Sequence, residues 1–154
     1  MKDRIKILIV EDDKLTQSIY RELLTDEIFE KTFAEDGVQA LELYNLMLPE
    51  VILLDIMLPQ MSGYVVLKKI REEIGDKTTA IIMSTSLSGK DDILGCMKLG
   101  IQGYVIKPTN YAELNLKIVE YFSKVNPEKA RALHQTLQAR KMAKSSPSPE
   151  RKSI

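Results

Sequence analysis

Short, almost unbroken runs of apolar residues recur along this chain and end abruptly in a charged or hydroxyl residue. Such runs are typical of strands buried on both faces, as in a parallel sheet. The carboxyl ends of parallel strands meet at one edge of an open α/β sheet, where ligands bind. We therefore expect the residues after these runs to form one site. The runs cover residues 5–10, 51–54, 80–84 and 103–106, and they are followed by Glu11-Asp12-Asp13, Asp55, Thr85 and Lys107.

Between these runs, apolar residues recur at the spacing of a helix. Leu15, Ile19 and Leu23 predict a helix over residues 14–25 with these three side chains buried. A short further strand is predicted over residues 31–34, and further helices over residues 37–46, 63–74, 91–99 and 111–124. This alternation predicts an α/β protein, a doubly wound five-stranded parallel sheet with the strand order 2-1-3-4-5. In that order the first and third strands are neighbours, so Asp12, Asp13 and Asp55 converge.

The composition is that of one ordinary domain, with 154 residues and 44% hydrophobic content. The single cysteine, Cys96, excludes an internal disulfide and is typical of a reducing compartment. No apolar stretch has the length that a bilayer span requires. The sequence therefore predicts a cytoplasmic protein with no membrane partner.

Charge is distributed unevenly along the chain. Residues 124–154 contain eight basic and two acidic residues, so the first 123 residues carry a net charge of −6 and the remainder +6. Asn126, Pro127 and Glu128 have the pattern of a helix start, and Leu133 and Leu137 give that helix a thin apolar stripe. We therefore divide the chain into a domain over residues 1–125 and a basic helix with a disordered Ser/Pro tail over residues 126–154. We expect this tail to be solvated or to reach for an acidic partner, and not to fold back on the domain.

The expected site has the chemistry of phosphoryl transfer. Clustered carboxylates repel one another and favour a hard divalent cation such as Mg²⁺. Lys107 could pair with one phosphoryl oxygen, the Thr85 hydroxyl could donate to another, and an aspartate could serve as the nucleophile. Glu11 is expected to point to solvent.

Four motifs, in this order and at this spacing, resemble the receiver domain of bacterial two-component response regulators. The resemblance covers about residues 4–124, implies a flavodoxin-like fold, and is greatest to stand-alone receivers of the chemotaxis-regulator type. The motifs are Asp12-Asp13, residues 54–59 with Gly63, Met83-Ser84-Thr85-Ser86, and residues 103–108.

The resemblance implies a role for each matching residue. Asp55 is the phosphoacceptor, and Mg²⁺ is bound directly by Asp13, Asp55 and the Met57 carbonyl and through water by Asp12. Lys107, Thr85 and Ser86 bind the phosphoryl group, Thr85 and Tyr104 form a switch pair, and Pro108 follows a cis peptide bond. The protein is then a signalling phosphoacceptor and not an enzyme.

The resemblance also implies partners. A sensor histidine kinase or phosphotransfer protein is expected to dock on the first helix through Gln17, Tyr20, Arg21 and Leu24, on the face opposite the predicted buried stripe. An output protein or a second copy is expected to bind the face formed by the fourth helix, fifth strand and fifth helix.

Two other functions are compatible with parts of the pattern. A phosphatase that forms a phosphoaspartate usually carries a second acid two residues after its nucleophile, where this chain has Met57. A DNA-binding regulator needs an output domain, and the roughly 30 residues after the receiver motifs hold no helix-turn-helix, so contact with nucleic acid is not expected. The Ser/Pro-rich segment is also typical of a linker, so a receiver of a longer transcriptional regulator remains an alternative.

Overall fold

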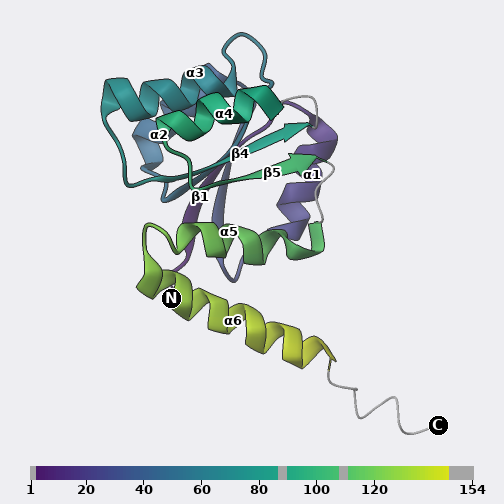
Figure 1. The fold of residues 1–154 in the computed structure, drawn as a ribbon. Helices are drawn as coiled ribbons and strands as arrows, with labels where there is room; N and C mark the ends of the chain where they lie inside the picture. Colours follow the sequence, from purple (N-terminus) through teal and green to yellow (C-terminus); the bar gives the residue numbers. More distant parts are fainter. Residues whose placement is uncertain (1–2, 87–89, 108–110, 146–154) are drawn as a thin grey trace, which may run out of the picture.

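The computed structural model describes residues 3–86, 90–107 and 111–145. Five parallel strands form one sheet in the order β2-β1-β3-β4-β5, which confirms the predicted topology (Figure 1). The strands are β1 (Ile5–Val10), β2 (Phe29–Ala34), β3 (Val51–Asp55), β4 (Ala80–Ser86) and β5 (Gly103–Lys107). The helices are α1 (Lys14–Leu23), α2 (Gly37–Met47), α3 (Gly63–Lys68), α4 (Lys90–Leu99), α5 (Leu114–Phe122) and α6 (Pro127–Ser145).

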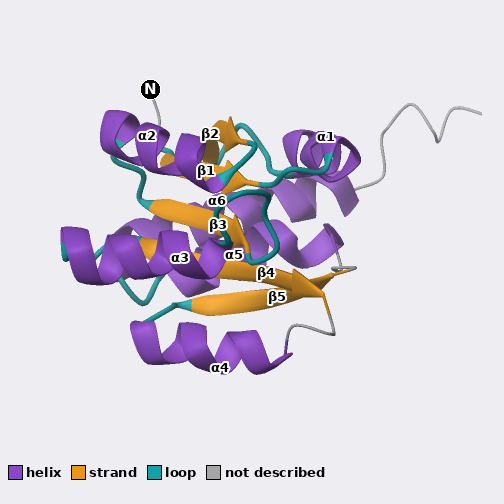
Figure 2. Ribbon diagram, turned by 90° about the horizontal axis from the view of Figure 1, so that it is seen from above, coloured by secondary structure: helices purple, strands orange, loops and turns teal. Residues whose placement is uncertain are grey.

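The helices cover both faces of the sheet (Figure 2). β1 contributes side chains to the hydrophobic core on each face of the sheet. Ile5, Ile7 and Ile9 pack with α1, α5 and α6 on one face. Leu8 and Val10 pack with α2, α3 and α4 on the other face. This alternation follows from the two-residue period of a strand. Among the described residues, none of the helices has both the length and the apolarity needed to cross a bilayer.

Several element boundaries differ from the sequence prediction. β2 begins at Phe29, two residues early, because Phe29 is fully buried and pairs with Ile5 of β1. The predicted third helix is α-helical only to Lys68 and continues as a π-helix, η1 (Lys69–Ile74), which ends at Gly75 with φ 80°. The predicted fifth helix opens with a 3-10 turn, η3 (Tyr111–Glu113).

The orientation predicted for α1 is wrong. Tyr20 is 1% exposed and Leu24 and Gln17 are also buried, whereas Leu15 is 70% exposed. Two stripes at helical spacing compete on this helix, and the stripe that contains the larger aromatic residue is buried. The Tyr20 ring packs edge-on against Tyr111 of η3, with ring centroids 6.3 Å apart. A docking surface that includes Gln17, Tyr20 and Leu24 is therefore excluded in this conformation.

The expectation that the segment after residue 125 stays away from the domain is also wrong for the first part of α6. Ala130 and Leu133 are buried in the core beneath α5. The Lys129 ammonium pairs with Glu50 at 2.9 Å and with Asp3 at 3.1 Å.

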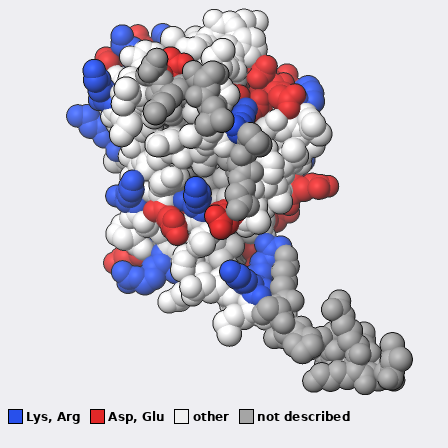
Figure 3. Space-filling view, turned by 45° about the vertical axis from the view of Figure 1, so that its right-hand side comes forward, with Lys and Arg blue, Asp and Glu red and all other residues white. Residues whose placement is uncertain are grey.

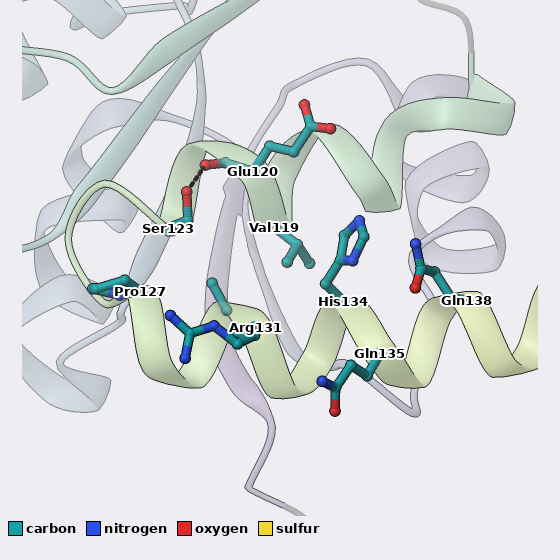
Figure 4. Close-up of a pocket in the computed structure, with 9 residues that line it drawn as sticks. Val119, Glu120, Ser123, Pro127, Arg131, His134, Gln135 and Gln138 are labelled. Atoms are coloured by element: carbon teal, nitrogen blue, oxygen red, sulfur yellow. Dashed lines mark hydrogen bonds between the residues drawn. The ribbon is translucent and has the colours of Figure 1, made fainter.

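Figure 4 shows the interface between the two helices, with Val119 of α5 and His134 of α6 directed toward one another. The predicted cap is present, since the Lys129 N–H donates to the Asn126 side chain at 3.2 Å. Beyond this interface, basic side chains lie beside the end of α6 (Figure 3), whose sequence includes Arg140 and Lys141. The predicted Ser/Pro tail lies outside the described residues after Ser145.

Candidate functional site

Three carboxylates meet at the carboxyl edge of the sheet. Asp55 is the last residue of β3 and is buried, and Glu11 and Asp12 follow β1. One oxygen from each of these three side chains lies within 4.8 Å of the others. The register explains the convergence: Val10 of β1 pairs with Leu54 of β3, so the next residues, Glu11 and Asp55, are neighbours.

The membership of this cluster differs from the sequence prediction. Glu11 was expected to face solvent, but it is only 2% exposed. Asp13 was expected to bind metal directly, but it caps α1, accepting the Thr16 N–H at 2.9 Å and the Thr16 hydroxyl at 2.6 Å. These hydrogen bonds lower the pKa of Asp13. Asp12 is exposed and belongs to the cluster. The strand register, which aligns Glu11 with Asp55, was the signal that could have identified Glu11.

Lys107, the last residue of β5, links two members of the cluster. Its ammonium donates to Glu11 Oε1 at 2.5 Å and to Asp55 Oδ2 at 2.8 Å. Burial lowers the pKa of Lys107, but hydrogen bonds to Asp55 and Glu11 outweigh burial and raise it above its ordinary value. Lys107 is therefore a fixed positive charge between two carboxylates.

Burial has the opposite result for Glu11. Removal from water raises its pKa, and the hydrogen bonds from Lys107 and from the Asp13 N–H oppose this shift only in part. Three carboxylates meet here and Lys107 pairs with only two of them, so the cluster offers oxygen ligands that a hard divalent cation can bind. The donor set of three carboxylates fits Mg²⁺, the ion predicted from the sequence.

The loop after β3 is held tightly against the site. The Met57 N–H donates to Asp55 Oδ1 at 2.9 Å, and the Gly63 N–H donates to the Ile56 carbonyl at 2.8 Å. A Cβ at Gly63 would lie 2.0 Å from the Asp55 carbonyl oxygen, so only glycine permits this approach. The Met57 side chain, two residues after Asp55, is largely exposed.

The predicted switch residues lie on one face of the sheet. Met83 pairs with Tyr104 and Thr85 pairs with Ile106, so alternation directs Thr85 and Tyr104 to the same side. Thr85 is buried and its hydroxyl donates to the Ser86 carbonyl at 3.2 Å, whereas Tyr104 is 41% exposed. Ser86, which follows Thr85, is exposed. Pro108 lies outside the described residues.

Residues 7–119 match the family model described as the response regulator receiver domain. The chain belongs to the response regulator receiver family. This receiver is 38% identical over 113 residues to the transcriptional regulatory protein CpxR of Escherichia coli, covering 73% of this chain and 47% of CpxR. It is 31% identical over 103 residues to the response regulator PleD of Caulobacter vibrioides, covering 67% of this chain and 23% of PleD. The chain spans at most about half the length of these curated relatives.

Solved structures agree with this assignment. The chemotaxis response regulator CheY4 of Vibrio cholerae is 28% identical, with a TM-score of 0.69 over 78% of this chain and 99% of CheY4. The receiver domain of Francisella response regulator 1452 is also 28% identical, with a TM-score of 0.68 over 79% of this chain and 98% of that domain. Receiver domains are signalling phosphoacceptors that partner with histidine kinases, and the acidic cluster of this receiver is consistent with a phosphorylation site.

Proposed function

We propose that Asp55 accepts a phosphoryl group from a histidine kinase or phosphotransfer protein and that Mg²⁺ is required. The observation that carries this proposal is the buried Asp55 carboxylate, within 4.8 Å of Glu11 and Asp12 and 2.8 Å from the Lys107 ammonium. Asp12, Asp55 and Glu11 would hold the ion, and the family resemblance adds the Met57 carbonyl. Bound Mg²⁺ supplies positive charge that offsets the negative charge of carboxylates and phosphoryl oxygens.

Each residue of the site then has a defined part in the transfer. An Asp55 carboxylate oxygen attacks phosphorus, and the bond from phosphorus to the donor histidine nitrogen breaks with its electron pair retained by that nitrogen. Lys107 exchanges its contacts with Glu11 and Asp55 for a phosphoryl oxygen. The Thr85 hydroxyl turns from the Ser86 carbonyl to a second phosphoryl oxygen, and Ser86 lies beside it. This positioning and charge neutralisation are the main contributions that a protein makes to phosphoryl transfer.

Labelling with a small phosphodonor tests this proposal. Incubation with acetyl phosphate and Mg²⁺ should add the mass of one phosphate, and chelation of the metal should prevent the addition. Asp55→Asn should abolish labelling, whereas the matched variant Asp13→Asn should retain it, because Asp13 caps α1 and lies outside the cluster. Labelling that persists in Asp55→Asn would refute the assignment.

The exposed face of α1 is the kinase-docking surface that we propose in place of the predicted one. Leu15 is exposed there, and Arg21 is exposed with its guanidinium 4.2 Å from the centre of the Phe33 ring. Exposed apolar and Arg side chains are suited to anchor a partner, and α1 begins directly after the loop that carries Asp12. Leu15→Ala with Arg21→Ala should slow transfer from the kinase and leave acetyl phosphate labelling unchanged. Equal loss of both reactions would contradict this assignment.

We further propose that phosphorylation is transmitted through Thr85 and Tyr104 to a partner-binding or dimerisation face on α4, β5 and α5. Support comes from the exposed apolar side chains on these elements, which include Leu94, Met97 and Ile106. We also propose that the protein is located in the cytoplasm. The 38% identity to the transcriptional regulatory protein CpxR supports, as a second candidate, the receiver part of a longer transcriptional regulator.

A further inference from the structure

Glu11 is held through its backbone as well as its carboxylate. Its N–H donates to the Ala34 carbonyl of β2 at 3.0 Å. Its carboxylate accepts the Asp13 N–H at 3.1 Å on Oε2 and the Lys107 ammonium on Oε1. The pairing of β1 with β2 ends one residue earlier, at Val10 and Ala34, so the Glu11 carbonyl lies beyond that ladder and needs another donor.

Gln17 supplies that donor from α1. Its side-chain Nε2 donates to the Glu11 carbonyl oxygen, and the residue is only 5% exposed. The partner is a carbonyl, which can only accept, so the amide must present its NH₂ group and not its oxygen. The Gln17 backbone N–H donates to the Asp13 carbonyl at 3.0 Å, which fixes the first turn of α1 against the loop that carries Asp12. A buried polar side chain thus joins α1 to the residue that begins the acidic cluster.

We propose that Gln17 is a positioning residue for metal binding, acting through Glu11. This inference rests on the proposed function, because it assigns Gln17 a role at the same Mg²⁺ site. The affinity of a site for a metal ion depends on the positions of its ligands. Replacement of a residue that orients a ligand commonly lowers the metal affinity by about 10–100-fold. Without the Gln17 donor, the Glu11 carbonyl is buried and unpaired, and the turn from β1 to α1 must shift to reach water or another partner. That shift carries the carboxylates of Glu11 and Asp12 with it.

The test uses Gln17→Met, which keeps the shape of the side chain and removes its donor. Mg²⁺ affinity is measured by isothermal titration calorimetry on the full chain, and labelling by acetyl phosphate is measured at saturating Mg²⁺. We expect the Mg²⁺ dissociation constant to rise about tenfold, at the lower end of the range for ligand-orienting residues. Labelling at saturating Mg²⁺ should stay within about twofold of wild type, because Gln17 does not touch the acceptor or the phosphoryl group.

Gln39→Met is the matched control. Gln39 lies in the first turn of α2 and also bonds to backbone, accepting the Glu35 N–H at 2.7 Å, but its partner is not a member of the cluster. This control should leave the Mg²⁺ dissociation constant unchanged. Gln17→Glu, which also lacks the NH₂ donor, should weaken Mg²⁺ binding at least as much as Gln17→Met.

The outcomes separate this inference from the proposed function. A wild-type chain that binds no Mg²⁺ and takes no label would refute the proposed function itself. A wild-type chain that does both, with equal Mg²⁺ affinity in Gln17→Met, would overturn only the role of Gln17. A lower melting temperature with unchanged affinity would likewise assign Gln17 to stability and reject positioning.

Discussion

Replacing Leu133 by alanine tests whether α6 belongs to the folded domain. Leu133 is 5% exposed and packs in the same cluster as Ile118, Phe122 and Ala130. Truncation of a buried leucine to alanine costs about 2–5 kcal/mol, and a site covered by a single outer helix can relax, so we expect the lower half of that range, ~2–3 kcal/mol. For a chain of this size the melting temperature should fall by roughly 4–12 °C.

Thermal unfolding followed by circular dichroism is the assay, with labelling by acetyl phosphate at 20 °C as a test of the intact site. Leu46→Ala is the matched control, because Leu46 lies on α2 and is 85% exposed. The control should change the melting temperature by little, since a surface helix position gains or loses only tenths of a kcal/mol. If Leu133→Ala and Leu46→Ala melt at the same temperature as wild type, α6 does not pack on the core in solution.

Three further predictions concern the site and its surroundings. Gly63→Ala should slow labelling of Asp55 and lower the melting temperature, because the added Cβ would collide with the Asp55 backbone. The control Gly95→Ala should do neither, because its added Cβ would meet only the Tyr64 ring, at 3.3 Å. Unaltered labelling in Gly63→Ala would contradict the close approach of Gly63 to Asp55. Burial raises the pKa of Asp76, but hydrogen bonds from Thr79 and Tyr44 outweigh it and hold that pKa below its usual range. The stabilisation from Asp76 is therefore present above its unfolded pKa of about 3.9 and is lost as the pH falls through the folded value. Melting temperatures from pH 6 to pH 2 should fall more steeply in wild type than in Asp76→Asn, and parallel curves would count against this. Met57→Asn should speed the loss of phosphate from Asp55 by about tenfold, which corresponds to ~1.4 kcal/mol of activation barrier. The reason is that the asparagine amide can orient the attacking water, whereas methionine cannot. Equal rates of phosphate loss in Met57→Asn and wild type would reject this role of residue 57.

The sheet and its order follow from the sequence because buried parallel strands leave a strong signal. The apolar runs mark four strands, the polar residue after each run marks the functional edge, and Asp55 and Lys107 lie 2.8 Å apart as that reasoning requires. The assignment of individual acids was less successful. Three successive acids follow β1, and only the register of β1 against β3 shows that Glu11, and not Asp13, adjoins Asp55.

Two further errors share one physical origin, since long-range contacts decided both. α1 carries two stripes at helical spacing, and the buried stripe is the one with Tyr20, whose ring packs against Tyr111 of η3, far along the chain. The basic charge of the C-terminal segment suggested a solvated arm. Lys129, however, pairs with Asp3 and Glu50, which are 126 and 79 residues away in the sequence. Local sequence patterns do not indicate which distant residues will contact a helix in the folded chain.

The central claim is that Asp55 carries the phosphoryl group, and chemical mapping of the phosphorylated residue tests it most directly. Borohydride reduces an aspartyl phosphate to homoserine, which tandem mass spectrometry locates in the digested chain. After treatment with acetyl phosphate and Mg²⁺, we predict homoserine at residue 55 and unmodified aspartate at Asp12 and Asp13. Homoserine at residue 12 or 13 with Asp55 intact would contradict the proposed site.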